Sequence, residues 1–458
     1  MGTFTPDSAR ALGGAGWLTE RRLAAAERFA AAELPTPSEE AWRYSRIDEL
    51  DLDRYRPGVV APGGGTFLIP TVERAATVRI LNGAVVGIDL EEAYAAKGLV
   101  VADIATLEEP PAALGACADG SPDAFTVMND AFMAGGVLVA VPDGMVVEHP
   151  IVVEHWVCGA GGASFPRTVV ALGEDAEAHV LERFTSPADA HLVVPVTELV
   201  LGDAARLRIL GMQDHGPEIW QVALMRATVG RDATLRASGV ALGGNYARLR
   251  SEALLTGAGA SSEMVAVYFA NESQMLDFRT LQDHDAPHTT SELLFKGAVE
   301  DEAQSVYSGL VRLRPAAQRA NATQTNRNLV LSEGASAKSI PNLEIECDDV
   351  RCSHASAVGP IDPDQLYYLA TRGVPPDVAE RLIVFGFFED AIDRLAFGWG
   401  SDRLRAAVAR KFDARRCCHP DQAVSGNRGQ EKPPSSGNRG QEKPPSSGNR
   451  GQEKPPSA

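Results

Sequence analysis

Two side chains that can bind iron lie near the end of a long region rich in valine, isoleucine and leucine. Cys352 and His354 are separated by one residue. On an extended strand their side chains leave from the same face, roughly 6–7 Å apart at the backbone. Iron and iron–sulfur clusters accept thiolate and imidazole ligands. The pair is therefore a candidate metal site, although the residues alone favour the simpler interpretation of a buried cysteine beside a hydrogen-bonded histidine.

One chain supplies too few ligands for a complete cluster site. A cluster usually takes about four protein ligands, and the six cysteines include no C-x-x-C pair or dense run. We therefore expect Cys352 and His354 to contribute to a site that another subunit completes.

Other candidate ligands are weaker. Cys347, five positions before Cys352, is expected on the opposite face of the strand and in the core. The acidic pair at 348–349 could assist iron delivery, but a solvent-exposed turn is the simpler interpretation. The run DHDAPH at 283–288 contains a proline and loop-forming residues, which favour a turn over a metal site. Cys-Cys-His at 417–419 predicts no dedicated site.

No catalytic motif is present. The sequence has no G-x-x-x-x-G-K-[ST] phosphate-binding loop, no Gly-Lys dipeptide and no G-x-S-x-G nucleophile motif. We therefore expect a non-enzymatic protein, with any ATP hydrolysis supplied by a partner.

Composition narrows the class of partner. The chain has 458 residues and a formal net charge of −18, so nucleic acid and anionic membrane surfaces are poor partners. No apolar run approaches the roughly 18–20 residues of a membrane span, and the N-terminus lacks the pattern of a secretory signal. We expect a cytoplasmic protein whose cysteines are thiols.

A repeated pattern in the middle of the chain predicts the fold. A large aliphatic residue is followed four positions later by Ala or Gly, with intervals of 29, 28, 26, 44 and 32 residues between the small residues. The six pairs are Leu172/Ala176, Leu201/Ala205, Val229/Ala233, Leu255/Gly259, Val299/Ala303 and Leu331/Ala335. A strand–turn–strand unit of this length suits one coil of a parallel β-helix, against a sandwich or barrel, and the long interval is read as an irregular rung.

Helical segments are expected on both sides of this core. Residues 19–34 carry an apolar stripe with Thr19 as N-cap, and a second short helix follows at 38–50 with Ser38 as cap. After Pro360, two further helices are expected, one ending near Gly373 and one starting at Pro375–Pro376. We therefore predict four parts.

The four parts have the following boundaries. They are an N-terminal helical region (1–75), a β-helix core (76–360, with 76–120 as a transition), a C-terminal helical domain (361–412) and a tail (413–458). The tail repeats GNRGQEKPPSS every 11 residues. The repeated unit contains no apolar residue that could anchor a core, so we expect the tail to be disordered.

The end of the repetitive region resembles a known protein family. PNLEIECDDVRCSHASAVGPIDPDQLYYLATRGV, from 341 to 374, is similar to the hallmark segment of the SufB/SufD family of the SUF iron–sulfur cluster assembly machinery. Segments 282–313 and 317–335, with WLTERRLAAAERF, EEAWRYSRI and VMNDAFMAGGVLVAVPDG, extend the resemblance over roughly residues 15–412.

The resemblance carries expectations about fold, partners and cargo. It implies a right-handed parallel β-helix with helical ends, pairing with SufB through the end of the β-helix and docking of the SufC ATPase on the C-terminal helices. It also implies a transient iron–sulfur cluster or iron at a shared interface, to which His354 and Cys352 would contribute. The residues do not show whether flavin binds.

Two departures favour the SufD branch over the SufB branch. SufB-like sequences carry a cysteine in the rung before the proline-led strand, whereas residues 333–341 contain neither Cys nor His. They also tend to place Glu where this chain has Ala355. A SufB-like paralogue and a purely structural β-helix subunit remain the alternatives. A β-helix enzyme of the lyase or acyltransferase type lacks its expected cleft or six-residue repeats.

Overall fold

The structure, a computed structural model, describes residues 2–58, 65–67, 72–119, 123–395, 405–406 and 408–411. The chain divides into two units, Met1–Phe412, which contains all the described residues, and Asp413–Ala458. The predicted tail, together with residues 417–419, lies outside the described residues. No helix in the described part is long and apolar enough to cross a membrane.

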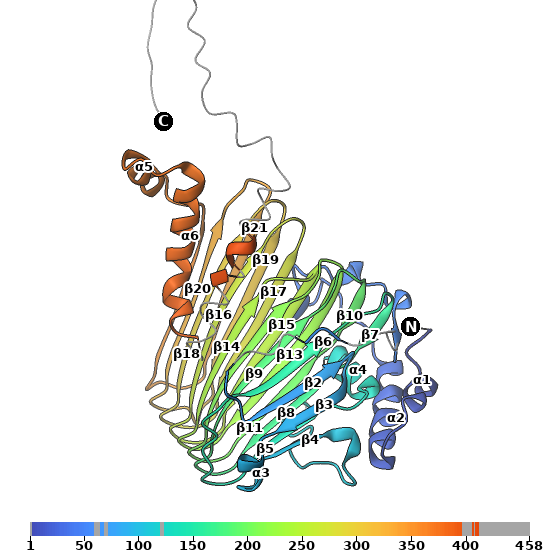
Figure 1. Ribbon diagram of the computed structural model, residues 1–458. Coiled ribbons are helices and arrows are strands. Elements are labelled where there is room, and N and C mark those ends of the chain that lie inside the picture. Colours follow the sequence, from blue (N-terminus) through green and yellow to red (C-terminus); the bar gives the residue numbers. More distant parts are fainter. Residues whose placement is uncertain are drawn as a thin grey trace, which may run out of the picture. The chain divides into compact units, whose positions relative to one another are not determined.

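Two long, mostly parallel sheets form the core of the first unit (Figure 1). Sheet A runs in the order β21-β19-β17-β15-β13-β11-β8-β5-β4, and sheet B in the order β22-β20-β18-β16-β14-β12-β9-β6-β2-β3. From β11 to β22 successive strands alternate between the sheets, and each pairs in parallel with the strand one coil away. The antiparallel pairs β4–β5 and β2–β3 lie at the first end. This is a parallel β-helix, which confirms the predicted fold class.

The strands of sheet A have the following bounds: β4 (Val100–Asp103), β5 (Val137–Val141), β8 (Arg167–Leu172), β11 (Val196–Leu201), β13 (Ile219–Val229), β15 (Tyr246–Leu255), β17 (Met275–His284), β19 (Gln304–Leu313) and β21 (Ser336–Ile345), with β1 (Arg56–Pro57), β7 (Gly162–Ser164) and β10 (His191–Val193) at its side. Those of sheet B are β2 (Ala76–Leu81), β3 (Ala84–Leu90), β6 (Ile151–Trp156), β9 (Glu177–Thr185), β12 (Arg206–Asp214), β14 (Thr234–Ala241), β16 (Ser261–Ala270), β18 (Thr290–Val299), β20 (Asn321–Val330) and β22 (Arg351–Gly359). Eight successive coils, from β5–β6 to β21–β22, can be traced in the described part.

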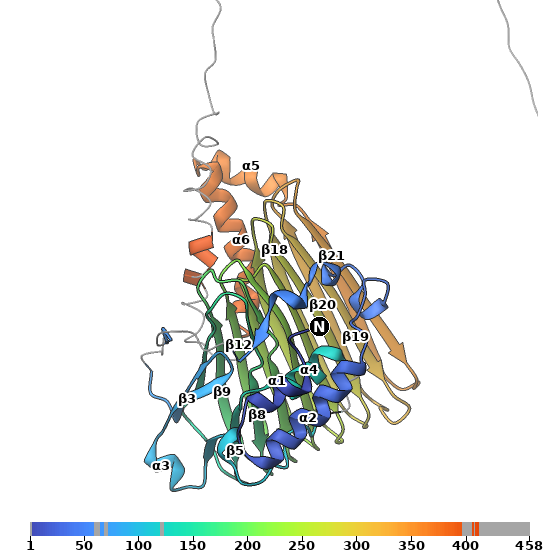
Figure 2. The ribbon, with the colours of Figure 1, turned by 90° about the vertical axis from the view of Figure 1, so that its right-hand side faces the viewer.

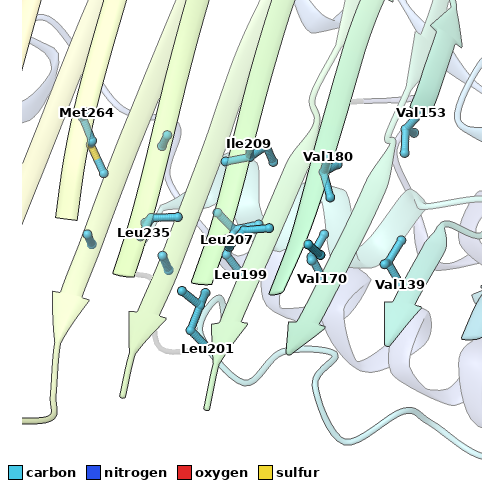
Figure 3. Packing of buried hydrophobic residues seen from close by; sticks show 14 of the residues in the cluster. Val139, Val153, Val170, Val180, Leu199, Leu201, Leu207, Ile209, Leu235 and Met264 are labelled. Atoms are coloured by element: carbon cyan, nitrogen blue, oxygen red, sulfur yellow. The ribbon is translucent and has the colours of Figure 1, made fainter. Parts of the chain in front are cut away.

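Alternate residues of each strand point into the lumen between the sheets. Figure 3 shows aliphatic residues from successive strands stacked there, among them Val170, Leu199 and Leu207. Because the same face recurs in every coil, each buried side chain packs on its register partners above and below. The lumen therefore holds one continuous hydrophobic core.

The repeated sequence pattern marks tight turns between the sheets. Ala176, Ala205 and Ala233 are fully buried directly after turns from sheet A to sheet B. At the fourth turn the chain has one extra residue, so the buried position is Ala260, whereas Gly259 adopts a positive φ of 75°.

The last two pairs lie on the opposite edge. Ala303 and Ala335 follow β18 and β20, where the chain passes from sheet B back to sheet A. One coil takes 29 residues, as the pairing of Tyr246 with Met275 shows. The 44-residue interval is therefore about one and a half regular coils. The predicted irregular rung was wrong, because the pattern changes edges rather than skipping a coil.

A helical layer covers the outer face of the first coils of sheet A (Figure 2). It comprises α1 (Pro6–Ala11), α2 (Gly16–Ala31) and α4 (Ala124–Phe132), and α3 (Glu92–Ala95) lies at the first end of the β-helix. The helix predicted at 19–34 forms three residues earlier, and Thr19 lies inside it, where its hydroxyl donates to the Ala15 carbonyl at 3.2 Å. The almost entirely buried α4 was not predicted.

The second predicted N-terminal helix does not form. Residues 38–50 contain only the short 3₁₀ turns Glu40–Trp42 and Ile47–Glu49, with a third turn at Leu52–Arg54. Tyr44 has a φ of 65°, which interrupts any helix. The buried Trp42 ring instead lies 3.8 Å from the Arg248 guanidinium on sheet A. Tertiary packing has overridden the local helical pattern.

Two helices follow the last strand: α5 (Pro363–Thr371), capped by Asp362 and followed by Gly373 with a φ of 79°, and α6 (Pro376–Ile392). Helix α6 packs on the outer face of sheet B, against β16 and β18 (Figure 1). Its buried face includes Val384 and Phe388, whereas Val378 and Leu382 are exposed.

Candidate functional site

The last coil leaves the lumen of the β-helix uncovered. β21 ends the order of sheet A and β22 ends that of sheet B, and within the described residues no further strand pairs with either. Residues 346–350 connect the two strands. Side chains that point inward from this coil therefore lack the packing layer that the next coil would provide.

Cys352 and His354 both lie on this uncovered inner face. They occupy alternate positions of β22, where their register partners on β20 are Ala322 and Gln324. Ala322 and Gln324 are buried, which identifies their face as the inward one. His354 is exposed and Cys352 is half-buried. The imidazole is thus accessible to a partner, on the same strand face as the thiol.

The Cys352 thiol packs against a small apolar cluster beneath the last coil. The cluster contains Val311, Leu313, Ala317, Ala320, Ala322 and Cys347. Burial, with a smaller contribution from Cys347, raises the pKa of Cys352. At neutral pH the side chain is therefore a protonated thiol, and it must lose a proton to become a metal ligand.

Cys347 lies in the same cluster, contrary to the expectation that it occupies the opposite face. It is buried, as predicted, but it follows the end of β21 rather than sitting on a strand. Its thiol lies 3.8 Å from the Ala317 carbonyl. The connection at 346–350 breaks the strand alternation on which the prediction depended. Burial raises the pKa of Cys347, with Asp348 and Glu346 contributing.

A polar layer beneath His354 was missed at the sequence level. Gln324 is almost fully buried and lies beside Tyr307, whose hydroxyl is 3.1 Å from that of Thr280. Gly309 leaves the space these groups occupy, because a Cβ there would lie 2.3 Å from Gln324 Nε2 and 2.4 Å from Tyr307 Oη. Polar residues at alternate positions 324, 326 and 328 were the available signal.

The other candidate ligands do not assemble into a metal centre. His284 is buried, with its ring nitrogens 2.7 Å from the Thr289 hydroxyl and 2.8 Å from the Ser291 hydroxyl, and His288 lies in the turn with a φ of 60°. Asp348 and Asp349 are exposed. In the described ranges there is no group of three or more His, Cys, Asp or Glu side chains that could hold a metal ion.

Apolar side chains surround the open end and the C-terminal helices. Ile345 at the end of β21 and Val358 on β22 are 48% and 44% exposed. On α5, Tyr367 and Tyr368 are 72% and 58% exposed. Phe387 is half-buried, with its ring centroid 4.8 Å from Lys296 Nζ. Large exposed apolar groups of this kind are typical of protein contacts.

Comparison with known proteins gives a consistent set of relatives. A family model described as "SUF system FeS cluster assembly, SufBD core domain" matches residues 155–387. An iron–sulfur cluster assembly SufBD family protein of Mycobacterium bovis is 35% identical over 63% of this chain and 73% of its own length. Iron–sulfur cluster assembly protein SufD of Escherichia coli is 26% identical over 79% and 85%, and SufD of Bacillus subtilis is 28% identical over 63% and 66%.

Proposed function

Because the chain belongs to the SufBD family of the SUF system for iron–sulfur cluster assembly, we propose that it is the SufD-type subunit of an assembly complex. It pairs with a SufB-type subunit at the open end of its β-helix and carries the SufC ATPase on its C-terminal helices. In this role it is a non-catalytic scaffold, and iron and the nascent cluster are its cargo.

The open inner face of the last coil is the observation that supports this proposal best. His354 is exposed there, Cys352 lies two positions away on the same face, and both sheets end at this coil. Two donors cannot fill the coordination of a cluster. A partner that covers the uncovered lumen would supply the remaining ligands and bury the apolar residues Ile345 and Val358.

Lowering the pKa of Cys352 is a further task for the partner. The pKa of this thiol is raised by burial, so the free chain holds it protonated. Iron or a cationic side chain brought by the partner would favour the thiolate. His354 is exposed at the open end, and imidazole is a ligand that iron accepts. We therefore assign His354 the larger contribution and Cys352 the smaller one.

The C-terminal helices are proposed to dock SufC. Helix α6 is fixed to sheet B by Val384 and Phe388, so α5 is presented on a firm support. Tyr367 and Tyr368 on α5 are exposed aromatic residues of the type that dominates binding energy at interfaces. The chain itself has no phosphate-binding loop. ATP hydrolysis would come from the docked subunit.

The assignment to SufD rather than SufB rests on residues 333–341. This rung contains neither cysteine nor histidine, so the chain lacks the extra thiol expected of the SufB branch. A purely structural subunit, with no ligand at the open end, is the main competitor. The cytoplasmic location expected from the sequence stays a prediction.

Co-purification tests the proposal as a whole. The tagged chain would be co-expressed with the SufB and SufC proteins of its own genome and isolated under anaerobic conditions. We expect a stoichiometric three-component complex that acquires the visible absorbance of a cluster on reconstitution. A chain that purifies alone under these conditions contradicts the assembly role. A complete complex that never acquires a cluster would favour the purely structural subunit.

A further inference from the structure

The lumen of the middle coils contains a cavity of about 100 Å³. It follows one column of register partners along sheet B: Glu182, Gly211, Gly239, Ala266 and Phe295. Large side chains end this column, and three small residues in succession lie between them. The missing side-chain volume of three adjacent coils therefore produces the space.

The two glycines face real space rather than a close neighbour. A Cβ at Gly211 would find only the Ser238 carbonyl, at 3.9 Å, and a Cβ at Gly239 only the Ala266 Cβ, at 3.5 Å. Neither glycine has a positive φ, so the backbone would accept any β-forming residue at both positions. The backbone conformation does not require glycine at these two positions. The absence of side chains there leaves the cavity.

The walls are apolar and adaptable over most of their extent. Met225 and Leu249 face the glycines from sheet A, Met264 lies on β16, and Phe278 closes the far end beside Phe295. Ile209 and Met264, which also line the cavity, are labelled among the packed core residues in Figure 3. Methionine side chains adjust to the shape of a bound molecule at low cost. Such a lining favours a ligand with an apolar body.

One end of the cavity is polar because of Glu182. Its Oε1 accepts hydrogen bonds from the Thr168 hydroxyl at 2.6 Å and lies 3.0 Å from His155 Nε2. Its Oε2 accepts one from the Thr197 hydroxyl at 2.9 Å. Burial raises the pKa of Glu182, but these hydrogen bonds outweigh burial and lower it overall. Within the described part of the chain Oε2 accepts that single bond, which leaves it able to accept another.

We propose that this cavity is a binding site for a small neutral molecule with an apolar body and one hydroxyl donor directed at Glu182. A charged ligand is disfavoured because it would lose its hydration and because the lining contains both Glu182 and Arg250, so an ion of either sign would meet a like charge. Size is limited as well, since cavities of about 150 Å³ accept benzene, so the ligand is no larger than one six-membered ring. Gly239 and Gly211 lie four and five coils from β22, and the proposal does not rest on the proposed cluster site.

Phenol and benzene are the matched probes, used with the full chain. Binding to the folded state alone raises the melting temperature as the ligand concentration increases. We expect phenol to raise the melting temperature more than benzene, because only phenol can donate to Glu182. Gly239→Val should fill the cavity and abolish both shifts. Gly386→Ala, on the distant α6, should keep them.

Xenon provides a readout that needs no variant. In xenon-pressurised crystals of the unmodified chain, the anomalous density should lie between Gly239 and Met264. Absence of xenon there together with no shift for either probe would overturn the site. Shifts that persist unchanged in Gly239→Val would place binding elsewhere and overturn it too. Equal shifts for phenol and benzene would remove the hydroxyl donor from the proposal.

Discussion

His354 and Gln324 are register partners on neighbouring strands, yet His354 is exposed and Gln324 is buried. Strands in such a ladder lie about 4.8 Å apart, so the whole change of environment takes place within one rung. The inward face of the β-helix continues to the open end, and it ends there in a histidine above a polar layer. Any subunit that continues the coil must meet this histidine first.

Gly309 permits the polar layer, so Gly309→Ala should destabilise the fold. A Cβ at this position would lie 2.3 Å from Gln324 Nε2 and 2.4 Å from Tyr307 Oη, and such overpacking costs about 1–3 kcal/mol. Urea unfolding measures the change. Gly211→Ala is the matched control, since its Cβ meets only one atom within 4 Å. An equal loss in both variants would contradict the claim of close packing.

Buried His284 predicts a loss of stability in mild acid. Burial lowers the pKa of His284 to about 4, below its ordinary value near 6.5. As the pH falls, the unfolded chain therefore binds the proton first. The stability that neutral His284 contributes is complete above pH ~6.5 and is lost towards pH 4, by up to about 3 kcal/mol.

His284→Gln isolates this contribution from those of other titrating groups. The glutamine keeps groups that can bond Thr289 and Ser291 but does not titrate. The difference in unfolding free energy between pH 7 and pH 5 should be smaller in the variant than in the unmodified chain. The same pH dependence in both proteins would show that His284 is not responsible.

The exposed tyrosines of α5 should be needed for ATPase capture and not for folding. Tyr367→Ala/Tyr368→Ala removes side chains that are 72% and 58% exposed, so the melting temperature should hold. Retention of SufC in a pull-down should fall at least tenfold, as expected for aromatic hot spots. Undiminished retention would move the docking surface elsewhere.

The control for this prediction is Phe388→Ala, which acts on folding. Phe388 is fully buried between α6 and sheet B, and truncating a buried phenylalanine costs about 3–5 kcal/mol. This variant should lower the melting temperature. Loss of SufC retention at an unchanged melting temperature in the tyrosine variant, together with a lower melting temperature in Phe388→Ala, would show that the tyrosines act in docking and Phe388 in folding.

Much of the fold could be predicted from the sequence because equivalent positions in successive coils of the β-helix have the same environment. Ala176, Ala205 and Ala233 recur after tight turns at nearly constant intervals, and stacking makes every one of them buried. The sequence did not show that the pattern moves to the turns from sheet B to sheet A before Ala303, because the turns at both edges use the same residue types. The helix expected at 38–50 failed for another reason: contacts with sheet A, far away in sequence, decide the conformation of Trp42.

The candidate site was predictable only in part. Alternation along a strand correctly places Cys352 and His354 on one face, but the break at 346–350 moved Cys347 into the cluster beneath Cys352. That Gln324 lies under His354 depends on the register between β20 and β22. The register between these two strands cannot be derived from a single sequence. The luminal cavity likewise arises from register, which aligns Gly211 with Gly239.

Cys352→Ser should weaken cluster loading without abolishing it. The thiol is half-buried and its pKa is raised by burial, so it is the less available ligand of the pair. We expect a reduced cluster absorbance in the assembled complex, with partner binding intact. Complete loss of the cluster would instead make Cys352 the principal ligand.

The central claim is that His354 ligates the cargo at the open end. Anaerobic reconstitution of the purified complex tests it, with His354→Ala compared against Ser356→Ala, an exposed neighbour on the same strand face. His354→Ala should preserve expression, SufB pairing and SufC capture, because an exposed side chain contributes little to folding, and it should lose the visible absorbance of the bound cluster. Ser356→Ala should keep that absorbance. A fully loaded cluster in the His354→Ala complex would contradict the account.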